Sequence, residues 1–134
     1  MPGIVCTNLS IAPGQKVSVK GDVLSGAKSF AINIGKDKES IILHFNARFD
    51  AHGDIRTIVC NSKINGQWGK ELRESNFPFQ EGSPTEILFT HDKKEVTITL
   101  SDNHQIKFPN DSGLETIDFI CTEGDLCFKI LSLV

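Results

Sequence analysis

The chain lacks most of the features that would assign it to a membrane, a nucleic acid or a metal. Its apolar runs fall far short of the roughly 20 residues that span a bilayer. Its net charge of −3 comes without a basic stripe that could hold a phosphate backbone. Neither C-x-x-C nor H-x-x-x-H spacing occurs, so no zinc-type ligand set is indicated. We therefore expect no metal or other cofactor, no nucleic-acid partner and no membrane insertion.

A secretory signal is also missing, because residues 1–6 show neither a basic n-region nor a long apolar h-region. The chain then stays in the cytosol, leaves by a route that bypasses the ER, or has lost a leader. Two disulfides are conceivable among the four cysteines, but cytosolic synthesis favours reduced thiols at Cys6, Cys60, Cys121 and Cys127. The N-glycosylation sequons at Asn8 and Asn110 would remain unused outside the ER.

No segment shows a three-turn apolar stripe of helical period, and no repeat, linker or low-complexity segment is present. Apolar and polar residues alternate instead, as strands require, in the stretches 17–20, 30–34, 96–100, 117–121 and 126–130. Turn signals separate these stretches at 12–14, 65–66, 81–84, 92–94 and 123–125. The pattern predicts one domain, residues 1–134, folded as an all-β, two-sheet antiparallel sandwich with no substantial helix.

One predicted strand combines a continuous apolar face with a row of hydrogen-bonding groups. His44, Asn46 and Arg48 are spaced by two and so share a face. The opposite face carries Leu43, Phe45, Ala47 and Phe49. An imidazole, an amide and a guanidinium in one row can fix the hydroxyls of a polyol, so this face is a candidate sugar site. A solvated surface histidine is the plainer alternative.

The Asn65-Gly66 pair predicts a two-residue hairpin, because both residues tolerate positive φ. That hairpin would place Asn61 and Trp68 on neighbouring antiparallel strands beside the polar row. The only tryptophan of the chain could cover the apolar C–H patch of a sugar ring. Two other interpretations remain open: Trp68 as a core residue, and Asn61 as a turn cap.

Glu71 and Arg73 share a face if the chain is extended there. With Arg48 from an adjoining strand they would form a row in which the Glu71 carboxylate lies between two guanidiniums. The alternative is a solvated ion pair that contributes about 0–1 kcal/mol. Simple alternation separates Trp68 from Glu71, and a bulge at Gly69 would bring both to one face.

Three runs in this order closely resemble the carbohydrate-recognition signature of the galectins, the β-galactoside-binding lectins: residues 44–48, 59–62 and 68–73. Similar text at 42–49, 51–54, 77–80 and 108–110 extends the resemblance over essentially the whole chain. The one departure is Ala47, where the family usually has proline, on the core side of the strand. The resemblance implies an eleven-stranded jelly roll of the single-domain, prototype kind.

The resemblance also implies roles for matching residues. His44, Asn46 and Arg48 would bind the axial 4-hydroxyl of galactose, Asn61 and Glu71 the 6-hydroxyl, and Trp68 would stack on the ring. Arg48, Glu71 and Arg73 would reach the adjoining glucose or N-acetylglucosamine, with His52 an outer contact and Asp54 orienting Arg48 or Arg73. It further implies export to the extracellular space without a signal peptide, and no metal requirement.

Both chain ends are apolar and could form a self-complementary patch if they meet at one edge. Because prototype galectins dimerise, we expect a homodimer that cross-links glycoconjugates, through Ile4, Val5, Ile130, Leu131 and Leu133. The alternative is that these residues only complete the core. Two rival functions are a glycoside hydrolase and a sandwich that binds only proteins. The first lacks a convincing second carboxyl near Trp68, and the second would require a broken motif, so we expect no enzyme.

Overall fold

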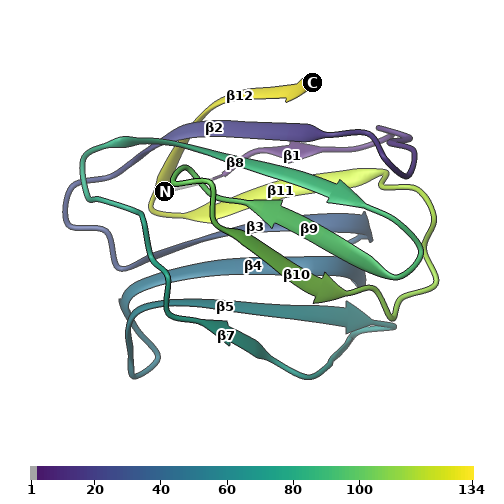
Figure 1. Ribbon diagram of the computed structural model, residues 1–134, viewed down its shortest axis with the longest axis horizontal. Coiled ribbons are helices and arrows are strands. Elements are labelled where there is room, and N and C mark those ends of the chain that lie inside the picture. Colours follow the sequence, from purple (N-terminus) through teal and green to yellow (C-terminus); the bar gives the residue numbers. More distant parts are fainter. Residues whose placement is uncertain (1–2) are drawn as a thin grey trace.

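The computed structural model describes residues 3–134, which form twelve strands in two antiparallel sheets (Figure 1). The predicted all-β, two-sheet antiparallel sandwich is confirmed. The seven-stranded sheet has the order β1-β11-β3-β4-β5-β6, with β7 also paired to β5. Its strands are β1 (Val5–Cys6), β3 (Ser29–Asp37), β4 (Ser40–Ala51), β5 (Asp54–Ile64), β6 (Gln67–Trp68), β7 (Leu72–Glu74) and β11 (Phe119–Gly124).

The five-stranded sheet has the order β10-β9-β8-β2-β12. Its strands are β2 (Val17–Val23), β8 (Pro84–His91), β9 (Glu95–Thr99), β10 (Gln105–Pro109) and β12 (Leu126–Leu133). Residues 3–134 contain no helix that is long and apolar enough to cross a membrane.

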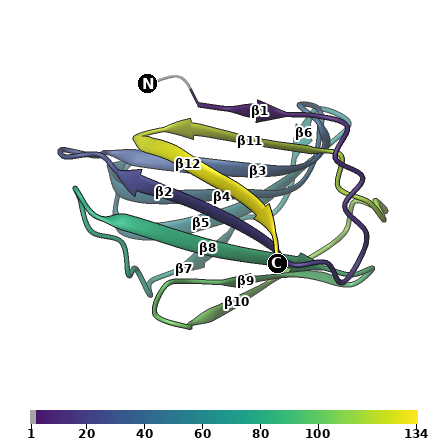
Figure 2. The same ribbon diagram turned by 90° about the horizontal axis from the view of Figure 1, so that it is seen from above.

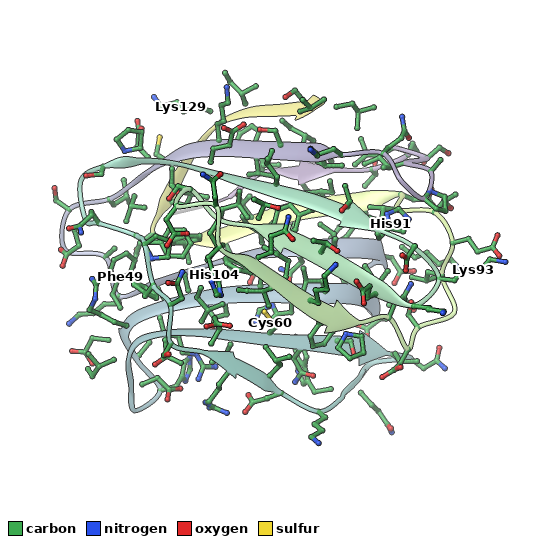
Figure 3. All side chains as sticks on the ribbon, in the orientation of Figure 1. Phe49, Cys60, His91, Lys93, His104 and Lys129 are labelled. Carbon is green, nitrogen blue, oxygen red and sulfur yellow. The ribbon has the colours of Figure 1, made fainter. Side chains whose placement is uncertain are left out.

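A phenylalanine cluster fills one part of the space between the sheets. Phe79 contacts Phe30, Phe45 and Phe77 edge to face, with ring centroids 5.3, 6.2 and 5.2 Å apart. Phe30, Phe45 and Phe79 are each 1% exposed or less. Cys60 of β5 also lies inside, where burial raises the pKa of its thiol to about 12 (Figure 3). Together with aliphatic residues from both sheets, this cluster fixes one face of the β3-β4-β5 region.

Strand β4 alternates as the sequence predicts. Phe45 and Ala47 are fully buried in the core, and Phe49 follows them inward. The intervening His44, Asn46 and Arg48 therefore project from the outer face of the seven-stranded sheet. Core packing thus orients the polar row, because a one-residue slip would drive it into the phenylalanine cluster.

The predicted turns hold, while two strand details differ. Gly14, Gly66, Gly82 and Gly124 all have positive φ at the predicted turns. The stretch 117–121 becomes a strand only from Phe119, since Ile117 forms an isolated bridge with Ile11 instead. The described residues form twelve strands rather than eleven, because residues 69–71 interrupt one edge strand and divide it into β6 and β7.

The two terminal strands lie at the same edge of the sandwich, one in each sheet (Figure 2). Val5 of β1 and Ile130 and Leu133 of β12 are exposed by 61, 50 and 56%. Leu131 differs, because it pairs with the buried Val19 and packs against the core. The exposed patch at this edge therefore consists of Val5, Ile130, Leu133 and Val134, with Ile4 half-buried beside it.

Candidate galactoside-binding site

An open pocket lies on the outer face of the seven-stranded sheet, over β4, β5 and the β6–β7 segment. It contains most of the residues that the sequence singles out. The lining consists of His44, Arg48, Val59, Asn61, Trp68, Gly69 and Glu71.

Strand register brings these side chains to one face. His44 lies opposite Asn61 in the β4–β5 pair, and Trp68 lies opposite Lys63 in the β5–β6 pair. Opposed residues in an antiparallel pair project from the same side of the sheet. The Asn65-Gly66 turn makes the second pairing possible, with φ values of 50° and 80°. Asn61 is therefore a site residue within a strand, and the turn-cap alternative is wrong.

A bulge at residues 69–71 puts Trp68 and Glu71 on that same face. From the Lys63–Trp68 pair to the Cys60–Leu72 pair, β5 advances three residues while the facing segment advances four. The extra residue reverses the alternation once, as a β-bulge does. The Gly69 amide donates to the Ser62 carbonyl at 2.9 Å. A methyl group at Gly69 would lie only 3.2 Å from Ser62 Oγ, so glycine keeps the segment close to β5.

Trp68 is an exposed ring. It is 52% exposed, which excludes the core alternative. Its indole lies 4.9 Å from the His44 ring between centroids, at 63°, and the Lys63 ammonium lies 5.4 Å from its ring centroid. These contacts hold the indole at one wall of the pocket, where about half of the residue remains exposed.

The ionic row differs from the predicted one. Arg48 Nη1 and Arg73 Nη2 donate to the same Asp54 oxygen at 2.7 and 3.2 Å, and Arg73 Nη1 donates to Glu71 at 2.6 Å. The carboxylate between two guanidiniums is thus Asp54, and Glu71 terminates the row. The prediction of Glu71 in the middle is wrong because β5 separates β4 from β7, so Arg48 and Glu71 are not on adjoining strands.

The row is anchored to the backbone through Asn46. Arg48 Nε donates to Asn46 Oδ1 at 2.8 Å, and Asn46 Nδ2 donates to the Phe30 carbonyl at 2.9 Å. Asn46 is only 7% exposed and does not line the pocket. A continuous chain of hydrogen bonds therefore runs from β3 to β7 and fixes the guanidiniums before any ligand arrives.

The two arginines keep the Asp54 carboxylate ionised. Their hydrogen bonds, Arg48 first and Arg73 second, lower the pKa of Asp54 below its ordinary value of 3.8. The same contacts, led by that to Glu71, raise the pKa of Arg73. The Asp54 carboxylate therefore acts as a hydrogen-bond acceptor at neutral pH.

His44 is held as a neutral imidazole. Its Nδ1 contacts Oδ1 of the Asn33 side-chain amide. This oxygen can only accept a hydrogen bond, so Nδ1 carries the proton. Burial, followed by the charges of Arg48 and Lys63, lowers the pKa of His44 below 6.5, and Glu123 partly opposes this. Nε2 is consequently an acceptor directed at the pocket side of the ring.

Asn61 offers its amide from within β5. It is 6% exposed, and its Oδ1 accepts from the Ser62 amide at 2.8 Å. Because Oδ1 is used in this way, Nδ2 is the group that it presents to a ligand.

One predicted site residue lies outside the pocket, and three residues that contribute to the site were not predicted from the sequence. His52 occupies the β4–β5 turn at φ 52° and lies outside the pocket lining. Val59, Lys63 and Asn33 border or support the site. Each lies opposite a predicted site residue in a neighbouring strand: Asn33 opposite His44, Val59 opposite Asn46, and Lys63 opposite Trp68. The strand register, had it been known, would therefore have identified all three. In residues 3–134 no group of three or more His, Cys, Asp or Glu side chains could hold a metal ion.

The sequence is similar to known galactoside-binding proteins. Residues 2–132 match the family model described as galactoside-binding lectin. Mouse galectin-1 is 49% identical over 130 residues, which cover 97% of this chain and 96% of the relative. A chicken β-galactoside-binding lectin is 50% identical with the same coverage.

Solved structures agree. The homodimeric agglutinin CG-16 from chicken liver has a TM-score of 0.95 at 45% identity, covering 98% of this chain and 99% of its own. A toad ovary galectin in complex with thio-digalactose has a TM-score of 0.96 at 40% identity, covering 100% of this chain and 99% of its own.

Proposed function

The chain belongs to the galectin family of galactoside-binding lectins, and we propose that it binds β-galactosides such as lactose and N-acetyllactosamine without cleaving them. The observation that carries this proposal is the pocket in which an exposed indole lies beside polar groups of β4, β5 and the 69–71 segment. The same arrangement would not serve an apolar ligand, whose burial would leave these groups unpaired.

Trp68 supplies the apolar part of recognition. A galactose ring presents a patch of C–H bonds with partial positive charge on one side, and the indole face is negative. The side chain is already held by His44 and Lys63, so little rotational freedom is lost when the sugar stacks on it.

The polar row supplies discrimination. The axial 4-hydroxyl of galactose would donate to His44 Nε2 and accept from Arg48, while Asn61 and Glu71 would bind the 6-hydroxyl. Glucose carries an equatorial hydroxyl at C4, which would leave His44 and Arg48 unmatched. Buried or half-buried polar groups left without partners are costly, so the site favours galactose.

Arg73 and Arg48 would bind the second sugar of the disaccharide. Both guanidiniums keep donors beyond those used by Asp54 and Glu71, since each has five N–H groups. His52, in the neighbouring turn, would contact ligands that extend past the disaccharide.

Hydrolysis is disfavoured by the state of the carboxylates. A glycosidase acid must hold a proton near neutral pH. Asp54 is bonded to two arginines, which lower its pKa, and Glu71 is bonded to Arg73. Asp54 therefore cannot serve as the acid, and the Glu71 carboxylate is occupied as an acceptor for Arg73.

We also propose that two copies associate through the apolar edge formed by Val5, Ile130, Leu133 and Val134, with Ile4 and Leu131 supporting it from below. A symmetric dimer at this edge would place two sugar pockets in one particle, and two linked pockets cross-link glycoconjugates with gain in avidity. A related chicken liver protein is a homodimeric agglutinin, which supports this proposal.

Localisation is proposed as cytoplasmic synthesis followed by export that bypasses the ER. The four cysteines carry free thiols. The Asn110 sequon is unsuited to glycosylation, because its Nδ2 donates to the Asp92 carbonyl at 2.9 Å and the residue is 8% exposed. Export of the protein from cultured cells should persist when ER-to-Golgi transport is blocked. Loss of export together with that of a conventionally secreted reporter would refute the route.

The test of the central proposal is retention on lactose–agarose with elution by free lactose. Trp68→Ala should abolish retention, Trp68→Phe should weaken it, and both should melt near the wild-type temperature. Lys107→Ala is the control, because Lys107 is similarly exposed (57%) on β10 of the other sheet. Wild-type protein that flows through the column would refute the function, whereas retained Trp68→Ala would refute only the stacking role.

A further inference from the structure

A row of three side chains crosses the outer face of the sheet beside the sugar pocket. Cys121 of β11 lies opposite Asn33 of β3, and Asn33 lies opposite His44 of β4. All three therefore project from the face that carries the pocket. Asn33 is 3% exposed and Cys121 8%, so the row lies under the rim of the site.

Hydrogen bonds join the row end to end. Asn33 Nδ2 donates to Cys121 Sγ at 3.3 Å, and Asn33 Oδ1 accepts from His44 Nδ1. The orientation of one buried amide thus decides which nitrogen of the imidazole carries the proton. If the amide were reversed, its NH₂ group would face Nδ1, and the proton would lie on Nε2.

We propose that Asn33 is a positioning residue for galactoside binding, held in orientation by the Cys121 thiol so that His44 presents the Nε2 lone pair to the sugar. The inference rests on the proposed function. In this arrangement His44 accepts a hydrogen bond from the galactose 4-hydroxyl, and the donors Arg48 and Asn61 remain for the oxygens. With the proton on Nε2, three donors would compete for the same hydroxyl oxygens.

The thiol suits this task because it remains protonated. Burial is the main cause that raises the pKa of Cys121. A thiol can accept from Nδ2 or donate weakly to Oδ1, and the observed bond from Nδ2 uses the stronger of the two donors. Serine could replace it as an acceptor, whereas alanine could not.

The charged groups around His44 act in addition to Asn33. Glu123 on β11 favours the protonated ring, while Arg48 on β4 and Lys63 on β5 disfavour it, and the Trp68 ring covers one side. A carboxylate in place of Asn33 would therefore raise the pKa of His44 from its lowered value, because the imidazolium would gain a direct ionic partner.

The decisive measurement is the tautomer of His44, read from the side-chain nitrogen signals of ¹⁵N-labelled protein by NMR without ligand. The wild type should carry the proton on Nδ1. A proton on Nε2 would overturn the proposal, whatever the lactose affinity, because the amide would then be reversed.

Calorimetric titration with lactose tests the consequence. Asn33→Leu should bind roughly 3- to 10-fold more weakly, the effect of one lost hydrogen bond, and should lose the single Nδ1–H tautomer. Asn33→Asp should shift the loss of lactose affinity on acidification to higher pH, which a merely structural role would not do. Asn76→Leu is the control, since this half-buried asparagine bonds Asp102 away from the pocket.

Cys121→Ala and Cys121→Ser provide a second pair if Asn33→Leu fails to fold. Alanine should populate both tautomers and weaken lactose binding, and serine should restore the wild-type tautomer. Wild-type affinity and a single Nδ1–H tautomer in both Asn33→Leu and Cys121→Ala would overturn the proposal. Failure of the wild type to bind lactose would instead refute the proposed function, and the tautomer measurement would remain valid.

Discussion

Deletion of Lys70 would remove the extra residue of the bulge without turning Trp68 and Glu71 to opposite faces. The segment from Trp68 to Leu72 would then match β5 residue for residue, with Trp68 still opposite Lys63 and Leu72 still opposite Cys60. Glu71 would lie two residues from Trp68, so simple alternation places both side chains on the pocket face. Leu72 would keep its packing against the core.

We therefore expect the deletion to change lactose affinity by no more than about threefold, or about 0.7 kcal/mol. If Glu71 and Arg73 turned away instead, binding would lose hydrogen bonds to charged groups, which contribute about 1.5–3 kcal/mol each. If Trp68 turned away, binding would lose stacking of about 0.5–1.5 kcal/mol in addition to the apolar area that the ring covers. A loss of about 2–3 kcal/mol would weaken binding roughly 30- to 150-fold, which separates these results from the expected one.

Isothermal titration with lactose measures the affinity, and thermal melting checks the fold. Lys70→Ala is the matched control: it keeps the chain length and changes an exposed residue, so its affinity should equal that of the wild type. A folded deletion variant whose affinity falls roughly 30-fold or more would refute this account of the register.

Three further outcomes follow from the site and the edge. Val5→Asp should weaken dimerisation while lactose binding persists, because an unpaired charge enters the apolar patch; an unchanged dimer in sedimentation at low concentration would contradict this. Lactose affinity should be constant from pH 8 to about 6.5 and fall only below that, because the pKa of His44 is lowered from its usual value and the imidazolium lacks an acceptor at Nε2. A loss centred above pH 6.5 in a calorimetric pH series would count against a lowered pKa. Asp54→Asn should weaken lactose binding roughly tenfold, since Arg48 and Arg73 must then be ordered by the ligand; wild-type affinity for this variant would show that the arginines are fixed without it.

Local patterns were sufficient for the parts of the fold that depend on neighbours in sequence. The two-residue period of β4 predicts its polar and apolar faces, because buried phenylalanines leave the intervening residues no other side. Asn65-Gly66 likewise predicts its hairpin, since positive φ is required at both positions. The resemblance to galectins supplied the ligand class, which polarity alone does not determine.

Pairing between strands that are distant in the sequence accounts for the features that could not be predicted. Nothing local to Glu71 shows that β5 lies between its strand and Arg48. The resemblance implied that Asp54 orients Arg48 or Arg73, and in the structure it accepts from both. The outward or inward direction of Leu131 depends on an irregularity between Phe128 and Ile130, which reverses the alternation late in β12. Bulges shift the register by one residue with little trace in composition.

The row from Arg48 to Glu71 is electrically balanced. Three ion pairs join two guanidiniums to two carboxylates, so the formal charges of the row sum to zero. A neutral sugar neither gains nor loses a net Coulombic interaction on entry, so lactose affinity should change little with ionic strength. The protein can therefore keep strong hydrogen-bond donors and acceptors in its pocket without becoming a general trap for anions, and glycans are selected by the directions of their hydroxyls.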